Sequence, residues 1–198
     1  MKKLLILLFS ILISFNSYGE EVELDFSLDS FCDQSPKVQV RNNLYYLPNK
    51  EKPYSGENIC VYLSNGQYFS QGKIKKGLRH GTWSFWYENG QKKAERNYKD
   101  GKIMRKSNYK NGKIVGETGY GYYENGQIEI EVNFKDGKKD GKATHWHENG
   151  QKKLEKYYKD GKEDGKWTTW YENGQKRYEE NYKDGKKVGK LTEWYENG

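Results

Sequence analysis

The sequence predicts an all-β protein, an elongated antiparallel sheet of tandem β-hairpin repeats of about 24 residues each. Three observations predict this fold. The phrase Glu-Asn-Gly-Gln recurs in steps of 24 residues at Glu124, Glu148 and Glu172. A second phrase, Lys-Asp-Gly, alternates with the first. The segments between the two phrases are rich in Tyr, Trp and Thr, which favour strands.

The composition agrees with a thin structure. Of the 198 residues, 33% are hydrophobic and 32% are charged, a balance that excludes a large closed core. The 18 Tyr, 7 Phe and 6 Trp nevertheless supply apolar area that disordered chains lack. We therefore expect a folded protein with little depth.

The first element is an N-terminal leader. Lys2 and Lys3 precede an apolar run over Leu4–Phe15, and small residues follow at Ser17 and Gly19. The run is shorter than the roughly 20 residues that span a bilayer, so residues 1–19 read as a signal peptide. The protein is then exported, to the periplasm, the cell surface or the medium. Its basic residues alternate with acidic ones, which does not favour nucleic-acid binding.

The second element is a cap, followed by the array. The repeat pattern fades before Pro53, so residues 20–52 are expected to cover the first edge of an array over residues 53–198. Cys32 and Cys60 are the only cysteines. In an exported chain they suggest a disulfide between cap and array, and two buried free thiols are the alternative.

Each repeat is expected to be one hairpin plus the turn to the next. Asn-Gly and Asp-Gly adopt the positive φ angles of tight hairpin turns. Across Asn89 and Gly90, Phe85 then pairs with Ala94 and Trp86 pairs with Lys93. A single hairpin is marginal in water, so the repeats must stack.

Alternation along these strands assigns two faces. The face expected to be buried is the apolar one: Trp83, Phe85, Tyr87, Ala94, Tyr98, Tyr123, Ile128, Ile130, Val132, Phe134, Leu154 and Tyr158. The other face is polar except for one aromatic position per repeat, the aromatic column: Tyr62, Trp86, Tyr122, Trp146, Trp170 and Trp194. These rings either lie along lysine stems such as those of Lys93 and Lys153, or grip an extended partner at a spacing of about 10 Å.

Two irregularities interrupt the array. The step from Glu88 to Glu124 is 36 residues, so a bulge or altered curvature is expected between Lys102 and Gly121. At the other end, Leu191–Tyr195 is expected to form a sheet edge that pairs with a strand of a partner or of a second copy of this chain.

The segments "YKDGKKDGKATHWHENGQ", "YKDGKEDGKWTTWYENGQ" and "IKKGLRHGTWSFWYENGQ" resemble the MORN repeat, in the variant found in bacterial YwqK family antitoxins. The resemblance covers about residues 53–198. It implies an elongated sheet of successive hairpins and a role in binding proteins or membranes. The antitoxin family further implies a toxin as partner.

Motifs for catalysis, cofactors or metals are not predicted. The glycines in Gly137–Thr144 enclose three residues, not the four of a phosphate-binding loop. His145 and His147 share one side of a strand, but two ligands are too few for a metal site. Glu95, Glu131, Glu155 and Glu179 recur in every repeat, as expected of lysine partners across strands rather than of an active site.

The sequence therefore predicts an exported, non-enzymatic binding or scaffold protein that acts through protein–protein interaction. Two alternatives remain open, namely an antitoxin or immunity protein whose partner is a toxin, and a cell-wall or glycan-binding protein that uses the aromatic column. A membrane surface is a further candidate partner.

Overall fold

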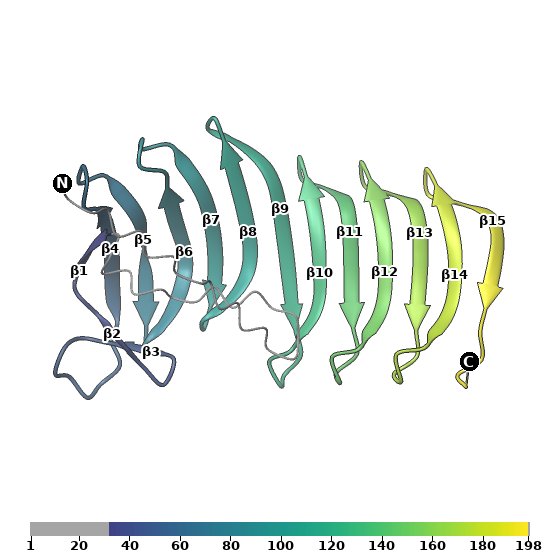
Figure 1. Ribbon diagram of the computed structural model, residues 1–198, viewed down its shortest axis with the longest axis horizontal. Helices are drawn as coiled ribbons and strands as arrows, with labels where there is room; N and C mark the ends of the chain where they lie inside the picture. Colours follow the sequence, from purple (N-terminus) through teal and green to yellow (C-terminus); the bar gives the residue numbers. More distant parts are fainter. Residues whose placement is uncertain (1–31, 198) are drawn as a thin grey trace, which may run out of the picture.

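The structure is a computed structural model that describes residues 32–197. It contains a thirteen-stranded antiparallel sheet of successive hairpins in the order β1-β4-β5-β6-β7-β8-β9-β10-β11-β12-β13-β14-β15, and a separate two-stranded sheet, β2-β3 (Figure 1). The all-β prediction is confirmed. The strands are β1 (Cys32–Ser35), β2 (Gln39–Arg41), β3 (Leu44–Tyr46), β4 (Gly56–Tyr62), β5 (Tyr68–Lys75), β6 (Leu78–Trp86), β7 (Lys92–Lys99), β8 (Lys102–Lys110), β9 (Lys113–Tyr122), β10 (Ile128–Lys135), β11 (Lys138–Trp146), β12 (Lys152–Lys159), β13 (Lys162–Trp170), β14 (Lys176–Lys183) and β15 (Lys186–Glu193).

The two repeated phrases make two different turns. In the Lys-Asp-Gly turn, Asp100 has a φ of 48° and Gly101 a φ of 83°, the two positive values of a tight two-residue turn. In the Glu-Asn-Gly turn only the glycine is left-handed, for example Gly90 with a φ of 79°. The expectation of positive φ at both residues is therefore wrong for this turn, which is a longer loop closed by glycine.

The longer turn changes the pairing next to it. Phe85 faces Ala94 as expected, but Trp86 faces Lys92 instead of Lys93. Lys93 is an extra residue on β7, because a three-residue loop ending in a left-handed glycine leaves a bulge in the following strand. The same shift follows Thr169 in β13.

A small core fills one face of the first half of the sheet, β4–β8. Trp83 is 2% exposed and packs with Ile74 and Tyr98. Its ring lies over Gly72, where an added Cβ would come within 2.2 Å of it. Tyr45 and Tyr54, from the segment before β4, pack against this core. The first half is thus the deeper part of the molecule.

The apolar face is buried only in part. Trp83, Ala94, Tyr98 and Val132 are buried as predicted, whereas Tyr87 is 44% exposed. Tyr87 precedes a loop at the margin of the sheet, where no second layer of strands within residues 32–197 covers it. The remaining residues predicted for this face are half-buried: Phe85, Tyr123, Ile128, Ile130, Phe134, Leu154 and Tyr158.

The N-terminal edge of the sheet is closed by β1, which pairs with β4 and sets Cys32 opposite Tyr62. Gln34 lies opposite Cys60 and donates a 3.0 Å hydrogen bond to Asn58. Cys60 is fully buried, and the described residues contain no free cysteine thiol. The predicted signal peptide, residues 1–19, lies outside the described residues.

The long step in the repeat corresponds to one additional strand. The pairing shifts by one residue at Met104 in β8 and at Val115 in β9, which confirms the expected irregularity between Lys102 and Gly121. One extra strand also exchanges the margins of the sheet, because hairpin turns alternate between them. The Glu-Asn-Gly turn of β6–β7 therefore shares its margin with the Lys-Asp-Gly turn of β10–β11 (Figure 1).

The extra strand exchanges the faces as well. Directly paired residues point to the same face. One row of such pairs is continuous through both halves: Thr82, Asn97, Arg105, Gly119, Val132, Ala143, Lys156 and Trp167. Trp83, which follows Thr82, points to the opposite side. Trp83 and its repeat equivalent Trp167 therefore lie on opposite faces, and β10–β15 are turned by half a revolution about the long axis.

Direct contacts support this half-turn. The Arg105 guanidinium lies 5.7 Å from the centre of the Phe134 ring, on the face that carries Glu117. On the other face, the Tyr122 hydroxyl donates a 2.8 Å hydrogen bond to the carbonyl of Ile103, a residue that packs against the core. The apolar face of the second half thus continues the polar face of the first half.

Candidate binding surface

The repeated Asn-Gly phrase forms a chain of hydrogen bonds along the margin of the sheet. The Asn149 side-chain oxygen accepts a 2.9 Å bond from the Gln151 N–H, and its Nδ2 donates a 2.8 Å bond to the Glu172 carbonyl of the next repeat. Asn65 and Asn173 make the same pair of bonds. We call this arrangement the asparagine staple. It explains why the phrase recurs, since these copies and that of Asn125 each fix their neighbour. Asn89, in the last such turn before the extra strand, accepts from Gln91 but makes no bond to a following repeat within residues 32–197.

A second link comes from the aromatic residue before each turn. The Tyr123 and Tyr171 hydroxyls donate to the carbonyls of Trp146 and Trp194, at 2.6 and 3.1 Å. His147 takes the same place, with Nε2 3.1 Å from the Trp170 carbonyl. Sequence reasoning missed both kinds of link. The signal was available in the constant Tyr-Glu-Asn-Gly-Gln order, which a plain two-residue turn does not require.

The aromatic column does not form one continuous line. All six rings are half-buried. Because of the half-turn, Trp86 lies on one face, and Tyr122, Trp146, Trp170 and Trp194 lie on the other. Tyr62 lies on the face opposite to Trp86, because Cys60 pairs through Ser70 with Phe85. Four strands, β5–β8, lie between Tyr62 and Tyr122. The structure thus brings together four of the six predicted residues and separates two.

Lysines cover the rings of the column. Lys152 Nζ lies 5.5 Å from the centre of the Trp170 ring, and Lys176 Nζ lies 5.4 Å from that of Trp194. The sequence predicted that Lys93, Lys153 and their equivalents would lie along the column rings, and these lysines are one residue later in the chain than the ones observed there. The bulge after each turn causes the difference, and Lys93 instead lies 5.6 Å from the Tyr87 ring. The column is therefore at least partly structural.

Beside the column, the same face of the second half carries a row of alternating Glu and Thr, the Glu–Thr row: Glu131, Thr144, Glu155, Thr168, Glu179 and Thr192. Lys166 and Lys176 both lie 2.9 Å from Glu179, and their hydrogen bonds lower the pKa of its carboxyl. Burial acts to raise the pKa of Glu155, but the hydrogen bond and charge of Lys152, the charge of Lys142 and the hydrogen bond from Tyr157 together outweigh it and lower the pKa. These glutamates are ionised and form ion pairs with lysines, as expected of structural residues.

In the first half, two carboxylates hold the extra strand in place. Arg105 and Ser107 donate to Glu117 at 2.9 and 3.0 Å, and the arginine is the main cause of the lowered pKa of Glu117. The Tyr109 hydroxyl donates to Glu95. This bond and burial raise the pKa of Tyr109 to about 12.

The opposite face of the second half is rich in aromatic rings. We call it the ring-rich face: Ile130, Val132, Phe134, Leu154, Tyr158, Trp167, Tyr178 and Tyr182. Trp167 stands 5.0 Å from Tyr182 and under Lys156, whose Nζ is 3.6 Å from the ring centre. Glu180 is buried beside it and bound to Lys187 at 2.7 Å. Within residues 32–197, no other strand or sheet packs on this face.

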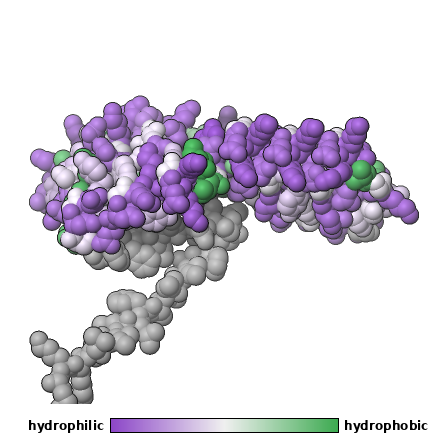
Figure 2. Space-filling model, turned by 90° about the horizontal axis from the view of Figure 1, so that it is seen from above, coloured by the Kyte–Doolittle hydropathy of each residue, from purple (hydrophilic) through white to green (hydrophobic). Residues whose placement is uncertain are grey.

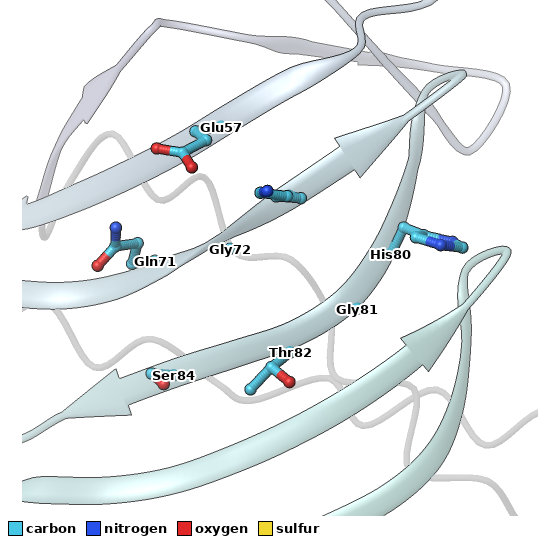
Figure 3. Close-up of a pocket in the computed structure, with 8 residues that line it drawn as sticks. Glu57, Gln71, Gly72, His80, Gly81, Thr82 and Ser84 are labelled. Carbon is cyan, nitrogen blue, oxygen red and sulfur yellow. The ribbon is translucent and has the colours of Figure 1, made fainter.

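The first half carries a shallow depression of about 400 Å³ (Figure 3). It is lined by Glu57, Gln71, Gly72, Lys73, His80, Gly81, Thr82 and Ser84. His80 Nδ1 lies 3.6 Å from Asp100, an exposed turn residue. Among the described residues, no group of three or more His, Cys, Asp or Glu is arranged to hold a metal. The depression gives the chain no evident catalytic constellation.

The surface seen from above the array in Figure 2 is mostly hydrophilic, with a few small hydrophobic spots. Exposed apolar side chains occur at hairpin ends, such as Ile114 at 47%, Val115 at 55% and Val188 at 44%. The described part of the chain has no helix that could cross a membrane.

Two solved structures are distantly similar to this chain. The crystal structure of TarM is 17% identical and covers 52% of this chain and 19% of its own, with a TM-score of 0.32. The crystal structure of the GtfA/B complex bound to UDP and GlcNAc is 15% identical and covers 62% of this chain and 27% of its own, with a TM-score of 0.34. The chain thus spans less than a third of either structure. No curated protein matches it.

The family of MORN repeat variants matches five segments, residues 79–100, 98–111, 118–136, 139–160 and 163–184. The matched segments include the extra strand and the hairpins on both sides of it. A repeat array of this type fits a role in binding or scaffolding. The chain therefore belongs to the MORN repeat variant family.

Proposed function

We propose that this chain is an exported, non-enzymatic binding protein whose protein partner docks on the ring-rich face of β10–β15. One observation carries the proposal: in the second half, a single layer of strands presents the eight aromatic or aliphatic side chains of this face, and no other described element packs on them. Aromatic residues are enriched at protein interfaces because they bury large areas at low entropic cost.

The asparagine staples order the ring-rich face before a partner binds. Each hairpin is fixed to the next by backbone pairing, by the asparagine staple and by the ring hydroxyl bonds. A surface that is already ordered loses little conformational freedom when it binds. The ring-rich face is also preferred over the aromatic column because its rings lie close together, with Trp167 5.0 Å from Tyr182 and 6.5 Å from Tyr178.

The test compares two adjacent tyrosines of β12. Tyr158 lies on the ring-rich face, and Tyr157 points to the opposite side. The full chain and the variants Tyr158→Ala and Tyr157→Ala are used for affinity capture from the cell envelope, followed by quantitative mass spectrometry. We expect Tyr158→Ala to lose the captured partner and Tyr157→Ala to retain it. Equal loss or equal retention argues against this face.

An antitoxin or immunity function is the second candidate, favoured by the repeat variant itself. It predicts that the captured partner is a toxin and that co-expression of the chain restores growth to cells that produce it. Capture of a partner that is not toxic argues against this function and leaves the binding proposal intact.

A glycan-binding function is the third candidate, favoured by the four column rings on one face. It predicts that the chain sediments with purified cell wall and that Trp170→Ala reduces this binding several-fold, whereas Tyr158→Ala does not. Binding that is insensitive to Trp170→Ala contradicts it.

A further inference from the structure

The sequence contains an unusual number of Asn-Gly pairs. They begin at Asn65, Asn89, Asn111, Asn125, Asn149, Asn173 and Asn197. In this pair the backbone nitrogen of glycine can attack the side-chain amide carbon of asparagine, because glycine has no Cβ to hinder the approach. Asparagine is therefore among the thermolabile residues of proteins.

The asparagine staple restrains both reacting groups. In the turn of Asn149, the amide oxygen and nitrogen are each held by a hydrogen bond, to Gln151 and Glu172. The attacking nitrogen, that of Gly150, donates a 2.9 Å bond to the His147 carbonyl. The turns of Asn65, Asn125 and Asn173 make the same three bonds.

Asn111 stands in the other kind of turn, between β8 and β9. It is exposed, its φ is 50°, and within residues 32–197 its side chain has no hydrogen bond. In four of the five equivalent turns the glycine N–H donates to the preceding segment or hairpin, as Gly101 does to Arg79 and Gly161 to Lys139. The exception among the described residues is Gly137 in the β10–β11 turn, which follows the β8–β9 turn at the same margin. Gly112 makes no such bond among the described residues.

The half-turn explains this difference. At its margin of the sheet, the β8–β9 turn follows the Glu-Asn-Gly turn of β6–β7, not another Lys-Asp-Gly turn. The carbonyl that would receive the Gly112 N–H is therefore not in place. Open space also surrounds Gly112, so water has access to the turn.

We propose that Asn111 is a site of spontaneous deamidation. The Gly112 nitrogen loses its proton to solvent base and bonds to the Asn111 amide carbon, and the side-chain nitrogen leaves as ammonia. Water then opens the cyclic imide at either carbonyl, which gives aspartate or isoaspartate at this position. No other reactant is required.

The two products have different structural consequences. Aspartate occupies the same turn position, with φ between 48° and 51°, at Asp100, Asp136, Asp160 and Asp184. The fold therefore accepts this product. Isoaspartate adds a methylene group to the main chain of a two-residue turn and disturbs the pairing of β8 with β9, the strands that produce the half-turn.

The test follows deamidation of the full chain in mildly alkaline buffer by peptide mapping and mass spectrometry. Loss of the restraining hydrogen bonds at Asn111 is expected to make it react about tenfold faster than Asn149. In the urea-unfolded chain, the two rates should become equal. Gly112→Ala is expected to slow the reaction at Asn111 alone, with circular dichroism reporting that the sheet is retained.

Similar rates at Asn111 and Asn149 in the folded chain overturn the proposal, as does faster reaction at Asn149. This outcome is independent of partner binding, because the measurement uses the isolated protein.

Discussion

At the scale of single residues, asparagine has two different roles in this array, and its place in the turn decides which. In the Glu-Asn-Gly turn it joins two repeats, whereas in the β8–β9 turn it only satisfies the backbone angle. Asn149→Asp replaces the donor to the Glu172 carbonyl with a carboxylate oxygen. We expect it to lower the free energy of unfolding by about 1 kcal/mol. Urea denaturation at constant m-value measures the change.

The matched control is Asn111→Asp, which introduces the residue that other turns of this kind already carry. Its effect should stay within about 0.5 kcal/mol, as for most exposed positions. Equal destabilisation by the two variants contradicts the staple.

Tyr109 provides a second residue-scale prediction. The hydrogen bond to Glu95, followed by burial, raises the pKa of its hydroxyl to about 12. Glu95→Gln removes the negative charge and should move this pKa back toward the usual value of 10.0. Nuclear magnetic resonance of ring-labelled tyrosine follows the titration, and Tyr109→Phe identifies the signal. An unchanged pKa in Glu95→Gln means that burial alone is the cause.

At the scale of strands, the extra strand makes a contact that a regular array does not have. Arg105 of β8 and Phe134 of β10 meet on one face only because of the half-turn. A double-mutant cycle of Arg105→Ala and Phe134→Ala should give a coupling energy of about 0.5 kcal/mol. The same cycle with Arg96→Ala, on the opposite face, should give none. Equal coupling in both cycles refutes the exchange of faces.

The first edge of the sheet carries the prediction for the cysteines. The pairing of β1 with β4 sets Cys32 and Cys60 in adjacent strands. A bridge between them stays a prediction, and free-thiol titration of the unfolded, unreduced chain checks it. Two reactive thiols exclude the bridge, whereas none, together with an unchanged monomer mass, supports it.

The strands show what the sequence could and could not reveal. Turn phrases and alternation were sufficient for the hairpins and for the pairing of Phe85 with Ala94, because both depend on local geometry. The predicted pairing of Trp86 with Lys93 was wrong, because the Asn-Gly dipeptide alone does not distinguish a two-residue turn from a three-residue loop. The sequence also did not predict that Trp86 and Trp146 lie on opposite faces. That result depends on the number of strands in the irregular segment, and the single-residue bulges in this segment leave no clear signature in the sequence.

At the scale of the whole molecule, paired carboxylates contribute to stability beside the small core. The pKa values of four glutamates, Glu95, Glu117, Glu155 and Glu179, are lowered from the usual 4.5. Their charged forms therefore stabilise the fold above pH 4.5, and this contribution is lost as the pH falls below 4.5 through the folded values.

We expect the melting temperature to fall steadily below this pH, and Glu179→Gln to make the fall shallower. Glu124→Gln, at an exposed turn residue whose carboxylate has no ion pair within residues 32–197, serves as the control and should leave the acid profile unchanged. Calorimetry across a pH series measures both. Identical profiles for the two variants contradict a stabilising role for the Glu–Thr row.

The half-turn also bears on how such chains change by duplication. Copying a full unit adds two strands and leaves every later side chain facing as before. Copying half a unit adds one strand, so that every later side chain points to the opposite face of the sheet although the later residues themselves are unchanged. One event of this kind, like the segment over β8 and its turn, presents an existing surface to the other side of the molecule. Strand number is thus a heritable variable separate from residue identity, and descendants with equal sequences in β10–β15 can differ in which partners they reach.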